Sequence, residues 1–186
     1  IVEKPIISLL KFKKKFLNFL KKIYQKKNKI VVCYPYIHLA KQFKRFFSSS
    51  KKIKNIKFEF QSGGKSKFKD ICINLMPHAL TFLHTFLKGG FLKSKIKKNV
   101  ILIKKDLWQV QFDFNKISIN IFFKVNFKKK TSLKVSINDL TFIRRTLKKN
   151  NKFINYIQNF KSHKKEIIDN PMGEFYKDFF KNLDDS

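Results

Sequence analysis

The sequence predicts an α+β domain in which helices pack on one face of an antiparallel or mixed sheet. Three observations support this class. The 186 residues are 43% hydrophobic and 16% aromatic with only five Gly and four Pro, so the chain can bury a core. Apolar residues recur at helical spacing in several segments of the first half. Apolar and polar residues alternate in the second half. Helices and strands that segregate in this way favour an α+β architecture.

Three parts are expected along the chain. Residues 1–28 have helical spacing with a basic face and predict a basic amphipathic N-terminal helix. Residues 29–150 form the predicted α+β domain. Residues 151–186 are expected to be a helical extension with an acidic end, because 166–186 holds six of the 12 Asp and Glu residues.

The first half of the domain predicts helices and short strands. A β-branched run at 29–34 ends at Pro35, and 36–47 returns to helical spacing. Strands are expected at 53–60 and 67–75, and a hairpin turn at Gly63 and Gly64 joins them. A helix is then expected to begin at Pro77, which needs no N–H there, and to stop at Gly89 and Gly90.

The second half predicts four strands and a closing helix. The strands are expected at 100–103, 107–114, 117–127 and 133–137, and the third alternates apolar with polar residues throughout except at Phe122. Asn138 and Asp139 are good helix caps, so a helix is expected to follow them through Asn150.

The charge of the chain predicts a polyanionic partner. The 43 Lys and Arg exceed the 12 Asp and Glu, which gives a net charge of +31, and a domain with this charge repels itself unless a polyanion neutralises it. Lys outnumbers Arg by 40 to 3 although Arg binds phosphate in a better fork geometry. This choice indicates an A+T-rich, organellar genome. No apolar stretch is long enough to span a membrane.

Enzyme chemistry, a cofactor and a metal site are not expected. Residues 63–66 read GGKS, but a phosphate-binding loop needs a Gly where Glu59 stands and a helix where a strand is predicted. The four His lack the carboxylate pattern of a metal site or catalytic triad. Cys33 and Cys72 lie in apolar runs and read as buried hydrophobes.

Basic patches between aromatic residues are the remaining candidates for a binding site. We expect them to contact phosphates, since each neutralised phosphate releases counterions. The residues lie on a predicted strand, in two loops and on a predicted helix, and are Lys65, Lys67, Lys69, Lys93, Lys95, Lys97, Lys98, Lys128, Lys129, Lys130, Arg144 and Arg145.

Two segments resemble a known ribosomal family. Lys65-Ser66-Lys67-Phe68-Lys69 before a strand at 71–75 and a helix at 79–87 is similar to the large-subunit protein of the central protuberance that binds 5S rRNA in bacteria. The strand at 133–137 before a helix resembles that family's last strand. The family's Gly-rich loop would be reduced to 88–99. The resemblance implies rRNA contacts at Lys65, Lys67 and Lys69.

The sequence therefore predicts a non-enzymatic structural constituent of a mitochondrial ribosome that acts in translation. Its partners would be rRNA, with the large subunit favoured, and neighbouring ribosomal proteins through residues 166–186. Two alternatives stay open: a small-subunit ribosomal protein, and a membrane-associated accessory subunit of a respiratory complex anchored by residues 1–28. A maturase or nuclease is a weaker alternative, because it would need paired acidic metal ligands.

Overall fold

The computed structural model describes residues 34–47, 52–87, 97–150 and 152–184. The expected N-terminal helix, most of the run at 29–34, Lys93 and Lys95 lie outside these residues. The described elements, in chain order, are α2 (Tyr36–Phe46), β1 (Asn55–Ser62), α3 (Lys69–Phe86), β2 (Lys97–Ile103), β3 (Leu107–Phe114), β4 (Ile117–Val125), β5 (Ser132–Ile137), β6 (Leu140–Lys149), β7 (Lys152–Asn159), β8 (Lys165–Ile168) and α4 (Pro171–Asp184).

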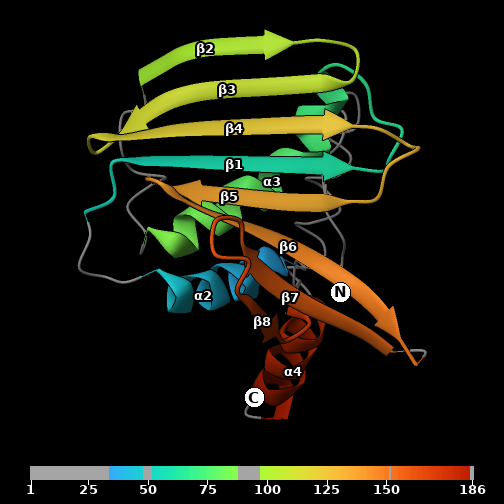
Figure 1. Ribbon diagram of the computed structural model, residues 1–186. Coiled ribbons are helices and arrows are strands. Elements are labelled where there is room, and N and C mark those ends of the chain that lie inside the picture. The colour runs from blue at the N-terminus through green and yellow to red at the C-terminus, as the bar shows by residue number, and fades with distance from the viewer. Residues whose placement is uncertain (1–33, 48–51, 88–96, 151, 185–186) are drawn as a thin grey trace, which may run out of the picture.

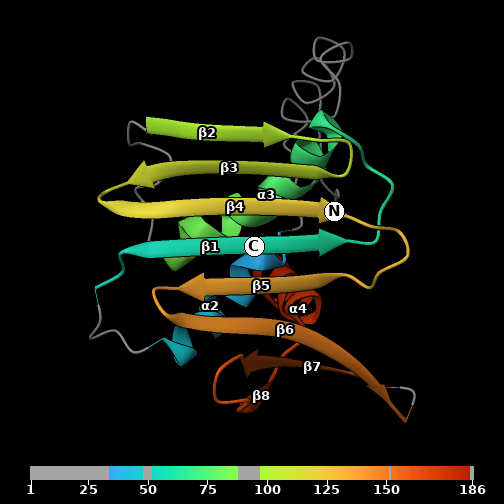
Figure 2. The ribbon, with the colours of Figure 1, turned by 45° about the horizontal axis from the view of Figure 1, so that its top comes forward.

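One eight-stranded sheet organises the domain, with the order β2-β3-β4-β1-β5-β6-β7-β8. Strand β1 is inserted between β4 and β5, so it pairs parallel with β4 and antiparallel with β5. The other neighbouring strands pair antiparallel. Helices α2 and α3 cover one face, while the last three strands turn away from the plane of the first five (Figures 1 and 2). The predicted α+β class with a mixed sheet and helices on one face is confirmed.

Alternation along the strands builds the core. In β1 the side chains of Ile56, Phe58 and Phe60 are buried against the helices, and the residues between them face the open side of the sheet. The same alternation runs along β3, β4 and β5. From the helices, Phe82 meets Phe58 and Phe43 at centroid distances of 5.4 Å each. A continuous aromatic core therefore joins the sheet to α2 and α3.

The strand expected at 67–75 is wrong, and so are the hairpin at Gly63 and the helix start at Pro77. Helix α3 begins at Lys69 and runs through the rest of this segment, with Pro77 in its interior. Ile71, Leu75 and Phe82 lie on its buried face at helical spacing. The short apolar run at 71–75 fits a strand or a buried helix equally by itself, and packing on the sheet decides for the helix.

The helix expected after Asn138 and Asp139 is also wrong, because residues 140–149 form β6. Asn138 has φ of 50° and sits in the tight turn that joins Ile137 of β5 to Leu140 of β6. Strands β5 and β7 flank β6 and satisfy its backbone on both sides. Residues 152–168, expected to be helical, form β7 and β8, and the helix of the extension is α4.

The acidic end of the chain packs within the domain. Helix α4 contacts α2, where the carboxylate of Asp178 lies 3.7 Å from Nε2 of His38. Gln42 of α2 also donates a hydrogen bond to the carbonyl oxygen of Asp169 at 3.4 Å. None of the described helices is long and apolar enough to cross a bilayer.

Candidate functional site

Three loops meet at one end of the sheet and form the strongest candidate site. They are the β1–α3 connection (63–68), the β2–β3 turn (104–106) and the β4–β5 connection (126–131). All three lie at the carboxyl ends of the parallel strands β1 and β4, on the right in Figure 1. We call these loops, together with Lys69, the basic edge.

Backbone hydrogen bonds hold the three loops together. The N–H of Asn126 donates to the carbonyl oxygen of Ser62 at 2.9 Å, which joins the ends of β1 and β4. The N–H of Phe68 donates to the carbonyl oxygen of Lys105 at 3.0 Å and joins the first two loops. The side-chain amide of Gln61 donates to the carbonyl oxygen of Lys130 at 3.2 Å. The basic edge is therefore positioned by the sheet itself.

A glycine stands where the first and third loops approach each other. A Cβ at Gly63 would lie 3.1 Å from the carbonyl oxygen of Lys129, closer than an ordinary van der Waals contact. The next residue, Gly64, donates its N–H to the hydroxyl of Ser62 at 3.1 Å. The missing side chain of Gly63 therefore lets the two lysine-bearing loops lie close together.

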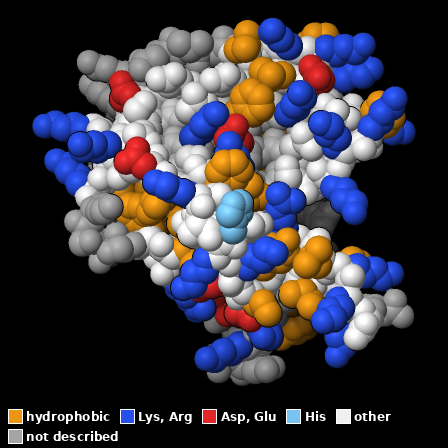
Figure 3. All heavy atoms as spheres, viewed as in Figure 1, with side chains coloured by type: hydrophobic (Ala, Val, Ile, Leu, Met, Phe, Trp, Pro, Cys, Tyr) orange, Lys and Arg blue, Asp and Glu red, His pale blue; other side chains and the backbone are white. Residues whose placement is uncertain are grey.

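Positive charge is concentrated at the basic edge. Its eight lysines are all exposed, and none forms an ion pair with another residue that the structure describes. In the three loops and the first turn of α3, all of which the structure describes, the acidic residues are Asp70 and Asp106. Figure 3 shows Lys and Arg side chains around this side of the molecule. The lysines are Lys65, Lys67, Lys69, Lys104, Lys105, Lys128, Lys129 and Lys130.

Two exposed aromatic rings stand among these lysines. Phe68 is 53% exposed and Phe127 is 70% exposed, although large apolar residues are usually buried. The ammonium of Lys128 lies 5.8 Å from the centroid of the Phe127 ring. Lysines and exposed rings together suit a ligand that carries both phosphate and a planar group, because the ammonium groups attract the charge and the rings stack on the plane.

The ring of His78 packs against aromatic side chains on the helix side of the sheet. The His78 ring lies 4.3 Å from the Tyr36 ring and 5.7 Å from the Phe60 ring, measured between centroids. Burial raises the pKa of Tyr36 far above its usual value. No group of three His, Cys, Asp or Glu side chains that could hold a metal ion occurs in the described parts of the chain.

The structure brings some of the predicted site residues together and separates others. Lys65, Lys67 and Lys69 meet Lys128, Lys129 and Lys130 at the basic edge, although the first three belong to a loop and a helix and not to a strand. Lys97 and Lys98 begin the edge strand β2.

The two neighbouring arginines lie on β6 and not on a helix. Arg145 is exposed. Arg144 is half-buried on the helix side and donates a hydrogen bond to the buried Asn155 at 3.2 Å. That contact gives Arg144 a structural role.

Sequence reasoning missed Lys104 and Lys105, and it left Phe68 and Phe127 unassigned. The two lysines lie between the runs at 100–103 and 107–114, both of which were expected to be strands. Such a short polar connection between two strands indicates a hairpin with a basic tip. The exposure of the two Phe residues has no signal in a chain with 23 Phe.

Comparison with known proteins identifies related folds. No family model and no curated protein matches the sequence. A dehydrogenase (MviM) from Clostridium difficile matches 99% of this chain and 62% of its own, with 9% identity and a TM-score of 0.61. The WlbA (WbpB) dehydrogenase from Thermus thermophilus, in complex with NAD and UDP-GlcNAcA, matches 97% and 56%, with 11% identity and a TM-score of 0.55. A Gfo/Idh/MocA family oxidoreductase from Vibrio cholerae matches 97% and 60%, with 9% identity and a TM-score of 0.52. This chain spans about three fifths of the length of these structures.

These findings overturn the ribosomal interpretation. The chain has the fold of part of Gfo/Idh/MocA-type oxidoreductases, and the resemblance to the 5S rRNA-binding family is wrong, because two of its quoted segments fold differently. The expected role in the ribosome, the expected partners (rRNA and neighbouring ribosomal proteins) and the expectation of a non-enzyme are contradicted, since the proteins that share the fold are dehydrogenases. The mitochondrial location stays a prediction.

The described residues do not fit a dinucleotide of the kind that some of these proteins hold. A dinucleotide fold needs a mostly parallel sheet and a G-x-G-x-x-G turn after its first strand. Here β1 and β4 are the one parallel pair in the described sheet, and residues 63–68 read GGKSKF. The first turn of α3 closes on itself, because the N–H of Asp70 donates to the carbonyl oxygen of Lys67 at 3.0 Å.

Proposed function

We propose that this chain is the substrate-binding part of a sugar oxidoreductase of the Gfo/Idh/MocA type. In this proposal the basic edge binds the diphosphate of a nucleotide-linked sugar. The fold supports the enzyme class, and the UDP-GlcNAcA held by the Thermus thermophilus enzyme supports the substrate class. The dinucleotide would be held by a part of the enzyme other than the described residues.

The observation that carries the proposal is the convergence of eight exposed lysines at the carboxyl ends of β1 and β4. A diphosphate brings two negative charges to this end, where lysines from three loops can share them. Hydrogen bonds already hold these loops, so binding would order little additional backbone.

The exposed rings at the same edge support a nucleotide over inorganic diphosphate. A nucleobase can stack on Phe68 or Phe127, and such stacking contributes about 1–3 kcal/mol per base in single-stranded nucleic acid complexes. The aromatic side chains of the basic edge would then supply part of the affinity that the phosphates alone lack.

Calorimetric titration tests this proposal directly. The ligands are UDP-N-acetylglucosamine, UDP and N-acetylglucosamine, each added to the full chain at moderate salt. We expect the first two to bind and the sugar alone to give no heat of binding, because the proposed contacts are with the nucleotide. Absence of saturable UDP binding would refute the proposal.

A matched pair of variants separates a site from a general effect of charge. One variant carries Lys65→Gln, Lys128→Gln and Lys129→Gln within the basic edge. The control carries Lys148→Gln, Lys152→Gln and Lys161→Gln, which are exposed lysines elsewhere and lower the net charge equally. We expect the first variant to weaken UDP binding at least tenfold and the control to weaken it less than twofold. Equal losses would show that net charge and not the basic edge holds the ligand.

A further inference from the structure

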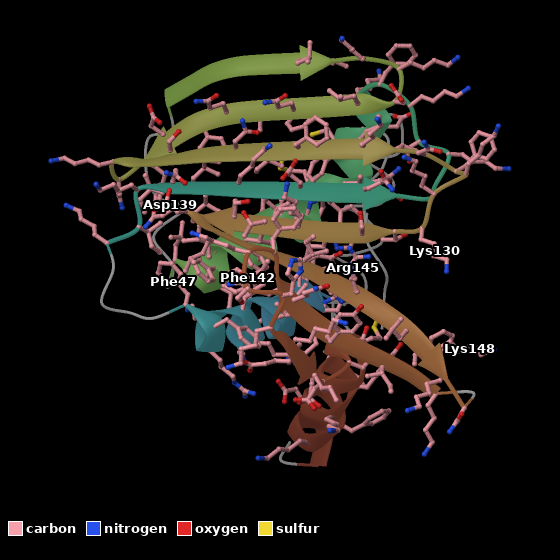
Figure 4. The ribbon with its side chains drawn as sticks, in the orientation of Figure 1. Phe47, Lys130, Asp139, Phe142, Arg145 and Lys148 are labelled. Carbon is pink, nitrogen blue, oxygen red and sulfur yellow. The ribbon has the colours of Figure 1, made fainter. Side chains whose placement is uncertain are left out.

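The outer part of the β6–β7 hairpin is an exposed surface that is both basic and apolar. It extends past the rest of the sheet at the lower right of both ribbon views, and Figure 4 labels Lys148 there. It consists of three cross-strand pairs, which are Leu147 with Ile154, Lys148 with Phe153, and Lys149 with Lys152. We call these six residues the hairpin end. None of them belongs to the basic edge.

Apolar side chains are exposed on both faces of the hairpin end. Side chains alternate along a strand, so Leu147 and Ile154 lie on the open side of the sheet and Phe153 lies on the helix side. Leu147 is 54% exposed and Phe153 is 71% exposed. On the open side the apolar surface continues through Tyr156 to its partner Ile167, which is 79% exposed. A flat partner could cover only one of these faces, whereas a fluid apolar phase can surround both.

The charged residues of this hairpin are all positive. Residues 140–165 hold eight Lys and Arg and no Asp or Glu. The three lysines of the hairpin end are exposed, and none forms an ion pair with a described residue. An anionic surface therefore complements the hairpin end. A second copy of this chain does not, because two such ends would bring like charges together.

The hairpin is held in place at its base. The buried Asn155 accepts hydrogen bonds from the hydroxyl of Thr146 at 2.8 Å and from the guanidinium of Arg144 at 3.2 Å. Strand β6 also pairs with β5, which anchors the hairpin in the sheet. Binding through the hairpin end would therefore order little additional backbone.

We propose that the hairpin end binds the surface of an anionic lipid bilayer. Leu147 and Phe153 enter the boundary between headgroups and acyl chains, and the lysines meet the anionic headgroups while their methylene groups lie along the apolar side chains. Nucleic acid fits less well, because bases can stack on Phe153 but leave the aliphatic Leu147 and Ile154 without a partner. This inference does not rest on the proposed function, since the two surfaces share no residue.

Vesicle binding by the full chain is the first test. The probe is a vesicle of phosphatidylcholine and phosphatidylserine in a ratio of about 7:3. We expect the chain to sediment with it and to bind pure phosphatidylcholine at least tenfold more weakly. At about 300 mM NaCl exposed charges are screened, and part of the affinity is expected to remain because apolar burial is not screened. Complete release at this salt concentration would overturn the proposal.

Tryptophan reporters locate the contact. The single native Trp108 is buried. Phe153→Trp and Phe127→Trp place a reporter at two sites of nearly equal exposure, 71% and 70%, the second in the basic edge. With brominated phosphatidylcholine in the vesicles, we expect quenching and a blue shift of the emission for Phe153→Trp only. Absence of quenching at 153, or equal quenching at both positions, would refute the assigned surface.

A matched pair of double variants measures the apolar contribution. Leu147→Ser with Phe153→Ser changes the hairpin end, and Phe68→Ser with Phe127→Ser changes exposed rings of the basic edge. At about 300 mM NaCl we expect the first variant to weaken vesicle binding at least tenfold and the second less than twofold. Urea midpoints check that both variants keep the fold. Equal losses would show that the hairpin end has no special role.

Three outcomes separate the bilayer from other ligands. An emission shift of Phe153→Trp with single-stranded RNA but not with vesicles would assign the surface to nucleic acid and overturn the proposal. Self-association without lipid, abolished by Leu147→Ser with Phe153→Ser, would assign it to a second copy and overturn the proposal as well. Failure of UDP to bind, with quenching at 153 intact, would refute only the nucleotide proposal.

Discussion

The side-chain oxygen of Asn138 accepts a hydrogen bond from the N–H of Lys54 at 2.9 Å, across 84 positions of sequence. The same oxygen accepts from the N–H of Asn55 at 3.3 Å, and the Asn138 side-chain amide donates to the carbonyl oxygen of Lys52 at 3.0 Å. One residue in the β5–β6 turn thus holds the segment that enters β1, the central strand that separates β4 from β5.

Replacing this side chain is expected to destabilise the domain. Asn138→Ala removes three side-chain hydrogen bonds and puts alanine at a φ of 50°, which asparagine tolerates better than alanine does. We expect a loss of about 2–3 kcal/mol in the free energy of unfolding, measured by urea denaturation. Asn138→Gly keeps the backbone conformation and loses only the hydrogen bonds, so it should lose less. Two variants as stable as the wild type would show that the turn needs neither feature.

The β3–β4 turn offers a stabilising substitution. Asn115 and Lys116 have φ of 47° and 65°, as in a two-residue hairpin turn of type I′. The Cβ of lysine makes this left-handed conformation unfavourable, whereas glycine has no Cβ and adopts it without a clash. We expect Lys116→Gly to raise the free energy of unfolding by about 1 kcal/mol. Asn115→Ala is the opposite control and should lower it. A decrease for Lys116→Gly would contradict the assigned turn.

The contact between α2 and α4 predicts a pH dependence of stability. Burial lowers the pKa of His38 and Lys41 lowers it further, while Asp178 and Glu174 oppose the shift. A folded pKa below the unfolded value of about 6.5 means that the unfolded chain binds more protons between the two values. The contribution of His38 is therefore complete above pH 6.5 and is lost as pH falls through the folded pKa.

Urea midpoints measured from pH 8 to pH 5 test this dependence. We expect His38→Gln to lose less stability than the wild type over this range, because the titrating group is gone. Asp178→Asn removes a carboxylate that favours the charged imidazole, so it should make the loss steeper. Identical pH profiles for the wild type and His38→Gln would show that His38 does not contribute.

UDP binding at the basic edge is expected to depend on salt. Salt screens exposed charges strongly, so UDP binding at the basic edge should weaken several-fold between 50 and 300 mM NaCl. Calorimetry at three salt concentrations measures the affinity. A UDP affinity that does not change with salt would contradict phosphate contacts with lysine.

Local patterns predicted the elements whose side chains alternate or recur regularly. The helix at 36–47 and the strands at 53–60, 107–114, 117–127 and 133–137 agree with α2, β1, β3, β4 and β5 to within two residues at each end. Each has one buried face, so its own sequence carries the period of its structure. The failures at 67–75 and 140–150 fall on segments whose apolar residues fit a helix and a strand nearly equally.

Asn138 illustrates why those segments escaped prediction. Its side chain suits a helix cap or a turn, because in both it accepts hydrogen bonds from nearby N–H groups. The donors that it finds are Lys54 and Asn55, which are near only after β1 has entered the sheet beside β5. No local pattern could show this.

For the basic edge, too, some features follow from the sequence alone and others only from the tertiary structure. The sequence by itself determined the excess of lysine, the apolar alternation and the α+β class, because these depend on composition and on neighbours a few residues apart. Only the tertiary structure decided that Lys65, Lys105 and Lys129 share one end of the sheet. Residues far apart in sequence meet through strand pairing, which is set by the packing of the whole core and not by any segment alone.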